Sequence, residues 1–186
     1  MAYNFSSPTM GCVNIGTYTT TAPGVAVLPG SVLEPQLGEI RTAYDLTLAS
    51  FGEFIYLKIP TSTAITANLL YQWANNYAVA VLPVLATSKN TGHPVAVATA
   101  TLASDATNIN YGWFQISGLA TVLKTAVAVS PDVVLYASGT AGRVKVLTSA
   151  GGQITGMRSA NVASVTSTTS TVTCYLSRPA MQGQVT

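Results

Sequence analysis

Alternation of apolar and polar side chains over most of the chain is the feature that most constrains the fold. The clearest examples are FIYLKI, VAVAT, WFQIS, VVLYA, RVKVL and TVTCYLS, which are rich in Val, Ile, Tyr and Thr. Successive side chains of a strand point to opposite faces, whereas a helix needs apolar residues three or four positions apart. We therefore predict an all-β chain, folded as a compact antiparallel β-sandwich or a barrel-like domain.

The first 37 residues differ in composition from the rest of the chain. Prolines and glycines are dense there and exclude a long regular element. We predict an extended arm over residues 1–37, followed by an all-β domain over 38–186. Further along, Ile65–Trp73 could form two helical turns, but we predict a strand that runs into a turn at Asn75 and Asn76. The residues that define the arm are Pro8, Gly11, Gly16, Pro23, Gly24, Pro29, Gly30 and Pro35.

Two segments of the chain echo each other. Asn68–Leu82 and Asp132–Leu147 align so that Leu70-Tyr71 meets Leu135-Tyr136, and the apolar residues after the turn also coincide. Each copy has two apolar runs joined by an Asn-rich or Gly-rich turn, which is typical of a β-hairpin. We hypothesise a duplicated β unit with repeated hairpins in 63–98 and 125–162. The alternative is chance similarity between strands made of small residues.

Charged residues are scarce, at 8% of the chain, against roughly 25% in an average soluble domain. Mean hydropathy is positive, at +0.40, so we expect neighbouring molecules to cover much of the neutral surface. A membrane is not the expected cover, because the longest apolar stretch, Tyr77–Ala86, is short and contains Pro83. The first residues also lack the features of a signal peptide, so we expect the chain to stay in the cytoplasm where it is made.

Groups that perform chemistry are few and dispersed. The one histidine, His93, lies in the turn sequence NTGHP, and the six carboxylates form no recognisable pair. We predict no catalytic residues, no cofactor and no metal site. Cys12 and Cys174 are expected as separate buried thiols, with a disulfide between them as the alternative. The eight basic residues are scattered, so we expect no binding to nucleic acid.

The stretch YGWFQISG, Tyr111 to Gly118, groups three aromatic residues. They could stack on sugar rings, or they could form core and subunit contacts. In a strand Tyr111 and Trp113 would point to one face and Phe114 to the other. We therefore predict that one face packs inward and that the other meets a neighbouring subunit or a sandwich partner, with the choice of face left open.

Three segments resemble a family of small structural proteins that decorate or cement the heads of tailed bacteriophages. GEIRTAYDLTLASFGEFIYLK (Gly38 to Lys58) resembles the opening of that family, YGWFQISGLATV (Tyr111 to Val122) its central strand, and YLSRPAMQGQ (Tyr175 to Gln184) its closing strand. The matches occur in the family's order. The chain departs from the pattern at Ala180 and Met181, where the family often has an aromatic residue.

The resemblance implies an all-β fold, no enzymatic activity, and assembly on the outside of an icosahedral head. The implied partners are the major capsid protein and further copies of this chain, as a dimer or trimer. Tyr3 and Phe5 of the arm, together with Trp113, Arg178 and Pro179, are the candidate residues for these interfaces. The alternative function is a carbohydrate-binding or receptor-binding β module of a virion fibre or a surface adhesin.

Overall fold

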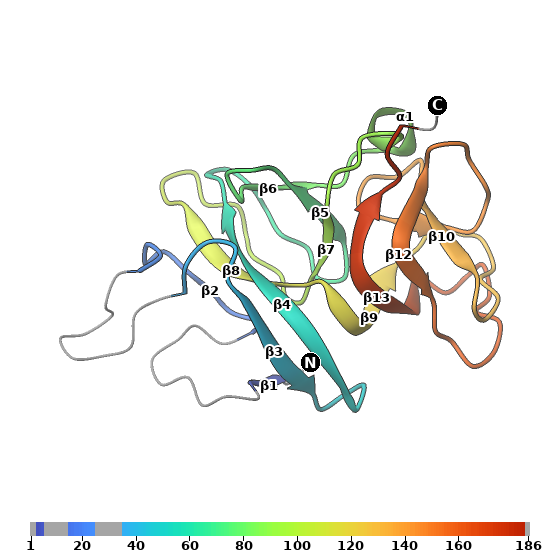
Figure 1. Cartoon of the computed structure of the whole chain (residues 1–186), viewed down its shortest axis with the longest axis horizontal. Helices are drawn as coiled ribbons and strands as arrows, with labels where there is room; N and C mark the ends of the chain where they lie inside the picture. The colour runs from blue at the N-terminus through green and yellow to red at the C-terminus, as the bar shows by residue number, and fades with distance from the viewer. Residues whose placement is uncertain (1–2, 6–14, 25–34, 185–186) are drawn as a thin grey trace.

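The computed structural model describes residues 3–5, 15–24 and 35–184, and its regular secondary structure is almost entirely strand, with 46% of the chain in strands and 2% in helix. The predicted all-β class is confirmed (Figure 1). The elements are β1 (Tyr3–Phe5), β2 (Tyr18–Thr19), β3 (Ile40–Asp45), β4 (Ser50–Ile59), β5 (Leu70–Trp73), β6 (Val79–Val81), α1 (Leu85–Ser88), β7 (Val95–Ala98), β8 (Asn110–Gln115), β9 (Ser117–Leu123), β10 (Val134–Ala137), β11 (Val144–Lys145), β12 (Gln153–Ser159) and β13 (Thr171–Met181).

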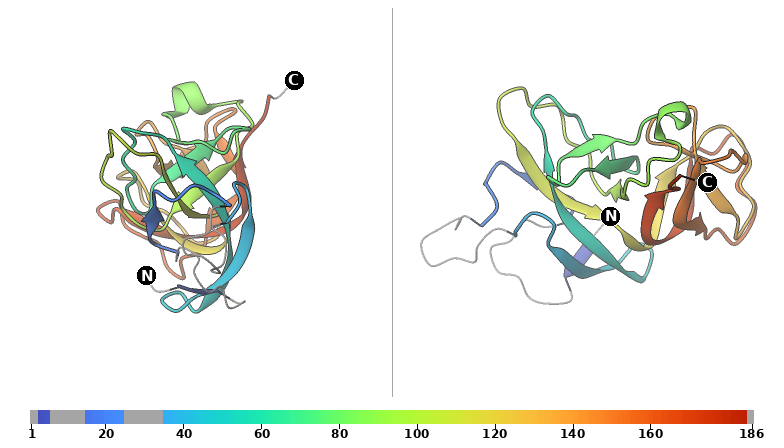
Figure 2. Two further views of the ribbon diagram at one scale, coloured as in Figure 1. Left: turned by 90° about the vertical axis from the view of Figure 1, so that its left-hand side faces the viewer. Right: turned by 45° about the horizontal axis from the view of Figure 1, so that its top comes forward.

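Two sheets lie side by side along the long axis of the molecule (Figures 1 and 2). The larger has eight strands in the order β1-β3-β4-β8-β7-β5-β6, with β2 paired to β8. The smaller has five strands in the order β11-β10-β12-β13-β9. Neighbouring strands within each sheet are antiparallel. Ile65–Trp73 ends in β5, and a turn at Asn75 and Asn76 follows, as predicted.

The core explains why β7 is apolar at every position. Val95 and Val97 pack with residues of the five-stranded sheet, whereas Ala96 and Ala98 pack inside the larger sheet with Phe114. All four residues of β7 are buried. A strand that is covered on both faces does not need to alternate apolar and polar residues. β7 therefore lies between two hydrophobic cores and contributes one face to each.

The two sheets repeat one topology. The order β6-β5-β7-β8-β4 of the larger sheet becomes β11-β10-β12-β13-β9 when each strand is replaced by the one five places later in the chain. In each unit a parallel bridge joins the two ends of this order, Lys58 to Ala78 in the first and Lys124 to Val144 in the second. Each unit therefore curls back on itself. The duplication hypothesised from sequence remains a hypothesis about the origin of the chain.

The two aligned residue pairs differ in burial. Leu70 and Leu135 are both buried in the core that contains the five-stranded sheet, and Tyr71 is buried in the core of the larger sheet. Tyr136, which aligns with Tyr71, is only half-buried.

Candidate functional site

The segments Gly38–Lys58, Tyr111–Val122 and Tyr175–Gln184 meet at one point between the sheets. Ile116 lies between β8 and β9, and its amide donates a hydrogen bond to the Glu53 carbonyl at 2.8 Å. The Arg178 amide donates to the Ile116 carbonyl at 2.7 Å. One residue of each segment therefore contributes to a single joint that holds β4, the β8–β9 connection and β13 together.

An ion pair closes the joint on its outer side. The Arg178 guanidinium donates from Nε and Nη2 to the two Glu53 carboxylate oxygens, each at 3.1 Å. This hydrogen bonding, with the charge of Glu53, raises the pKa of Arg178 above its usual value. Two parallel bonds fix the orientation of the Arg178 side chain. Arg178 is exposed but turned toward its own chain, which gives it a role in the joint.

Pro179 does not fit the role predicted for it. It is buried, at a point where the pairing of β12 with β13 shifts register between Thr155 and Met157. Proline is tolerated in a sheet at such bulges, because the amide it lacks is not needed there. Burial leaves Pro179 little surface for a partner, and its position next to Arg178 gives it a structural role at the joint.

Trp113 is also placed differently from the prediction. It is 0% exposed and lies in a core cluster with Phe54, Tyr56 and Ile15. Its ring centroid is 5.0 Å from that of Tyr56, and the Arg41 guanidinium lies over it at 5.8 Å. The face of β8 that carries Trp113 is covered by the chain's own early residues.

Phe114 points to the opposite face of β8, as expected from the strand period. It packs in the core of the larger sheet, at ring distances of 5.7 Å from Tyr71 and 6.3 Å from Tyr18. Both faces of YGWFQISG are thus core. Burial removes Trp113 and Phe114 from consideration as a sugar-stacking platform.

Tyr3 and Phe5 lie in β1, which pairs with β3 at the edge of the larger sheet. Their side chains are outside the described part of the structure. Within the predicted arm, β2 pairs with β8, and Ile15 and Leu37 pack against the cluster that holds Trp113. These described parts of residues 1–37 are therefore integrated into the sheet and its core.

Tyr18 ties β2 to the larger sheet. Its ring contacts the first core, and its hydroxyl donates to the Ala100 carbonyl at 2.9 Å. Burial, with a smaller contribution from Tyr71, raises the pKa of Tyr18 above the ordinary value of 10.0. The unfolded chain therefore releases this proton at a lower pH than the folded chain does.

We expect the contribution of Tyr18 to stability to be level up to about pH 10 and to fall as the pH rises further, because the unfolded state then holds fewer protons at this group. Tyr71, whose pKa burial also raises, adds to the same trend. Tyr18→Phe should make the decline shallower. Urea unfolding at about pH 8 and about pH 11 measures this, with Tyr175→Phe, which changes an exposed tyrosine, as the control. An unchanged pH dependence in Tyr18→Phe would contradict the assignment.

An exposed apolar surface lies at the end of the β3–β4 hairpin; we call it the hairpin tip and define it by Tyr44, Leu46 and Phe51. Phe51 is 61% exposed and Leu46 55%. Tyr44 and Phe51 are cross-strand partners, and their rings meet edge to face at 5.0 Å. The hairpin projects from the body of the sheet (Figure 1). An aromatic pair held in this way is a pre-ordered apolar contact surface.

The described carboxylates are engaged in structural contacts. Glu39, Glu53 and Asp132 pair with Arg41, Arg178 and Arg158. Asp45 and Asp105 accept backbone amides in the turns that follow them. Within residues 3–5, 15–24 and 35–184 no group of three or more His, Cys, Asp and Glu could hold a metal ion.

Cys174 is a free, buried thiol, and burial raises its pKa. Cys12 lies outside the described residues. Lys124 is a buried cation that the sequence did not single out: it is 1% exposed, and its Nζ donates to the carbonyls of Val127 and Thr166 at 2.9 and 2.8 Å. Among the described residues there is no helix with the length and apolar character needed to cross a membrane.

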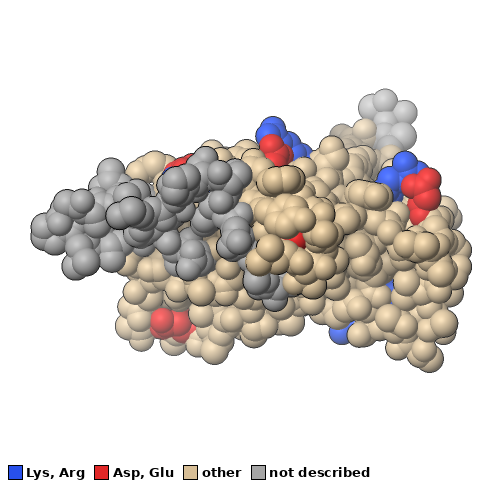
Figure 3. All heavy atoms as spheres, turned by 90° about the horizontal axis from the view of Figure 1, so that it is seen from below, with Lys and Arg blue, Asp and Glu red and all other residues tan. Residues whose placement is uncertain are grey.

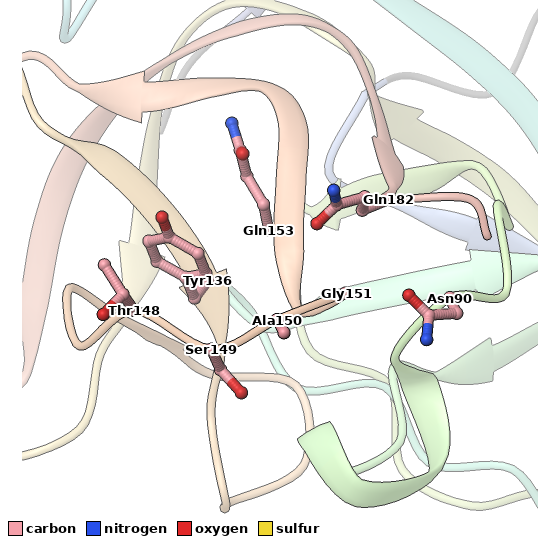
Figure 4. Close-up of a pocket in the computed structure, with 8 residues that line it drawn as sticks. All are labelled: Asn90, Tyr136, Thr148, Ser149, Ala150, Gly151, Gln153 and Gln182. Atoms are coloured by element: carbon pink, nitrogen blue, oxygen red, sulfur yellow. The ribbon is translucent and has the colours of Figure 1, made fainter. Parts of the chain in front are cut away.

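A hollow of about 560 Å³ opens between α1 and the five-stranded sheet; we call it the amide pocket (Figure 4). Its walls come from four separate parts of the chain, namely the turn after α1, β10, the β11–β12 connection with the start of β12, and the segment after β13. None of its lining residues carries a charge. They are Asn90, Tyr136, Thr148, Ser149, Ala150, Gly151, Gln153 and Gln182.

Comparison with known proteins gives no relative. No family model matches the chain, and neither a curated protein nor a solved structure matches it.

Proposed function

We propose that this chain is a structural virion protein that decorates the outer surface of an icosahedral phage head and stabilises neighbouring major capsid subunits. The proposal rests on three segments that resemble such proteins, and these segments are the ones that meet at the joint of Glu53, Ile116 and Arg178. The shared residues would then build the common scaffold, while the contacts with the head would lie elsewhere on the surface.

The observation that carries the proposal is the scarcity of charge on the surface. Of the eight Lys and Arg residues, Arg41, Arg158 and Arg178 are paired with carboxylates, and Lys124 is buried. That leaves Lys58, Lys89, Arg143 and Lys145 outside the ion pairs of the described residues. Figure 3 shows a face on which charged side chains are sparse and isolated. Such a surface suits a subunit whose neighbours cover it in an assembly, since a free monomer normally depends on surface charge for solubility. Binding only to the assembled shell would stabilise that shell by mass action.

The experiment that tests the proposal is addition of the purified chain to expanded heads of the phage that encodes it, prepared without this protein. We expect saturable binding that persists at about 0.5 M NaCl, because few charges are available to be screened. Co-sedimentation with the heads measures binding, and heat release of the packaged DNA measures shell stability. Absence of binding at every salt concentration would refute the proposal.

The hairpin tip is the surface proposed to meet the capsid or a second copy of this chain. We expect Phe51→Ser and Leu46→Ser to weaken head binding at least about tenfold, since exposed aromatic anchors dominate interface energies. Both side chains are exposed, so the unfolding free energy should change by less than about 1 kcal/mol. Val162→Ser, which alters a 100% exposed apolar residue in the connection between β12 and β13, is the matched control. Equal binding by all three variants would exclude the hairpin tip.

The alternative of a receptor-binding module loses two of the aromatic residues on which it rested, because Trp113 and Phe114 are core residues. The amide pocket favours this alternative, because its lining side chains are neutral and can form hydrogen bonds with a ligand. These residues are not the aromatic residues of YGWFQISG. The two functions are separable by experiment, because the pocket and the hairpin tip share no residue.

A further inference from the structure

The amide pocket gathers polar side chains that have no partner within the protein. Six of its eight lining residues carry neutral donors or acceptors, and in the described part of the chain none of these six side chains makes a hydrogen bond. The six are Asn90, Tyr136, Thr148, Ser149, Gln153 and Gln182. These side chains line one hollow and leave hydrogen-bonding groups available there, as a site for a polar ligand requires.

The backbone around the pocket is held in place. The Asn90 amide donates to the Gly151 carbonyl at 2.9 Å, and the Gln182 amide donates to the Gln153 carbonyl at 2.8 Å. The segment after α1 and the segment after β13 are thereby fixed to the two ends of one short stretch. Side chains carried on a fixed backbone lose less freedom when they bind, which favours affinity.

The amide side chains come from different walls of the pocket. In Figure 4, Gln153 and Gln182 extend on one side of the pocket, with Tyr136 and Asn90 at its flanks. Gly151 has φ +72°, and a side chain at this position would collide with that of Asn90. The pocket therefore depends on a glycine that leaves room for the amide.

We infer that the amide pocket binds a neutral oligosaccharide. The hydroxyl groups of a sugar both donate and accept hydrogen bonds. The side-chain amides of Asn90, Gln153 and Gln182 each offer an NH₂ donor and a carbonyl acceptor to match them. An anionic ligand would call for basic side chains, and the pocket has none. The half-buried Tyr136 adds a flat apolar ring beside the amides, so that one wall of the site can contact the apolar face of a sugar.

A second hollow continues the site and points to a chain of sugars instead of a single one. It measures about 310 Å³ and shares Gln153 with the amide pocket. Tyr175, 54% exposed, lies on its far side. Arg158, which also lines it, is neutralised by Asp132 at 2.8 Å. Tyr136 and Tyr175 thus lie on either side of Gln153 along the outer face of the five-stranded sheet.

This inference is independent of the proposed decoration of a phage head, because it uses no residue of the joint or the hairpin tip. It is tested by titrating the full chain, labelled with ¹⁵N, with maltohexaose, cellohexaose and chitohexaose in turn. We expect at least one of these probes to shift the side-chain amide signals of Asn90, Gln153 and Gln182 saturably. The dissociation constant should be about 1 mM or tighter, and unchanged between about 0.05 and 0.5 M NaCl.

Two variants locate the site. Gln153→Ala should weaken binding at least about tenfold, whereas Asn75→Ala, at an exposed turn of the other unit, should leave it unchanged. Three results would overturn the inference: no amide shift with any of the three probes at about 10 mM, equal binding by Gln153→Ala, or tighter binding of the acidic hexasaccharide of hyaluronan. Thermal unfolding of Gln153→Ala distinguishes a lost contact from a lost fold.

Discussion

Replacement of Trp113 by alanine is expected to lower the free energy of unfolding by about 3–5 kcal/mol. The side chain is 0% exposed and fills the cluster between β8 and the early residues that cover it. Its removal would leave a cavity next to Tyr56 and take away the ring beneath Arg41. Urea unfolding followed by far-UV circular dichroism measures the loss.

Tyr175→Ala provides the comparison for Trp113→Ala, because Tyr175 is an exposed aromatic residue. It should cost less than about 1 kcal/mol. A loss below about 1 kcal/mol for Trp113→Ala would show that the tryptophan is not core, and would restore it as a candidate contact with a neighbour.

The second large effect is expected at Gly118, where β9 crosses β4. A side chain added to Gly118 would collide with the Phe51 carbonyl oxygen and come within 2.9 Å of the Gly52 Cα. Gly118 also has φ +88°, a conformation unfavourable to other residues. Gly118→Ala should therefore lower the unfolding free energy by about 3 kcal/mol or more, from backbone strain and overpacking together.

Gly16 separates the two causes. It has the same φ of +88°, but an added side chain would meet nothing within 4 Å. Gly16→Ala should thus cost only about 1–2 kcal/mol, the part due to backbone conformation. Equal losses of unfolding free energy in Gly16→Ala and Gly118→Ala would mean that β9 and β4 do not approach each other closely.

Much of the fold follows from the sequence because its main signal is local. The strand period and the turn at Asn75 and Asn76 predict the all-β class and the β5–β6 hairpin. The alternation of side chains along a strand does not reveal which of its two faces is covered by another part of the chain. The early residues that bury Trp113, and the five-stranded sheet that buries Val95 and Val97, are distant in sequence.

The site residues show the same limit. Arg178 was singled out from a motif, but its partner Glu53 lies more than a hundred residues earlier, so only the folded chain reveals the joint. The amide pocket had no sequence signal at all. Asn90, Gln153 and Gln182 are common polar residues in separate segments, and no spacing between them marks a ligand site.

Assembly on the head surface is the central claim, and a cryo-EM reconstruction of the virion of the phage that encodes this chain tests it most directly. We expect density for the two curled units on the outer shell at a symmetry-related position, with the hairpin tip directed at the major capsid protein or at another copy of this chain. The same density should be absent from particles that lack the gene and return when the purified chain is added. Identical shells with and without the gene, or density confined to the tail, would contradict the claim.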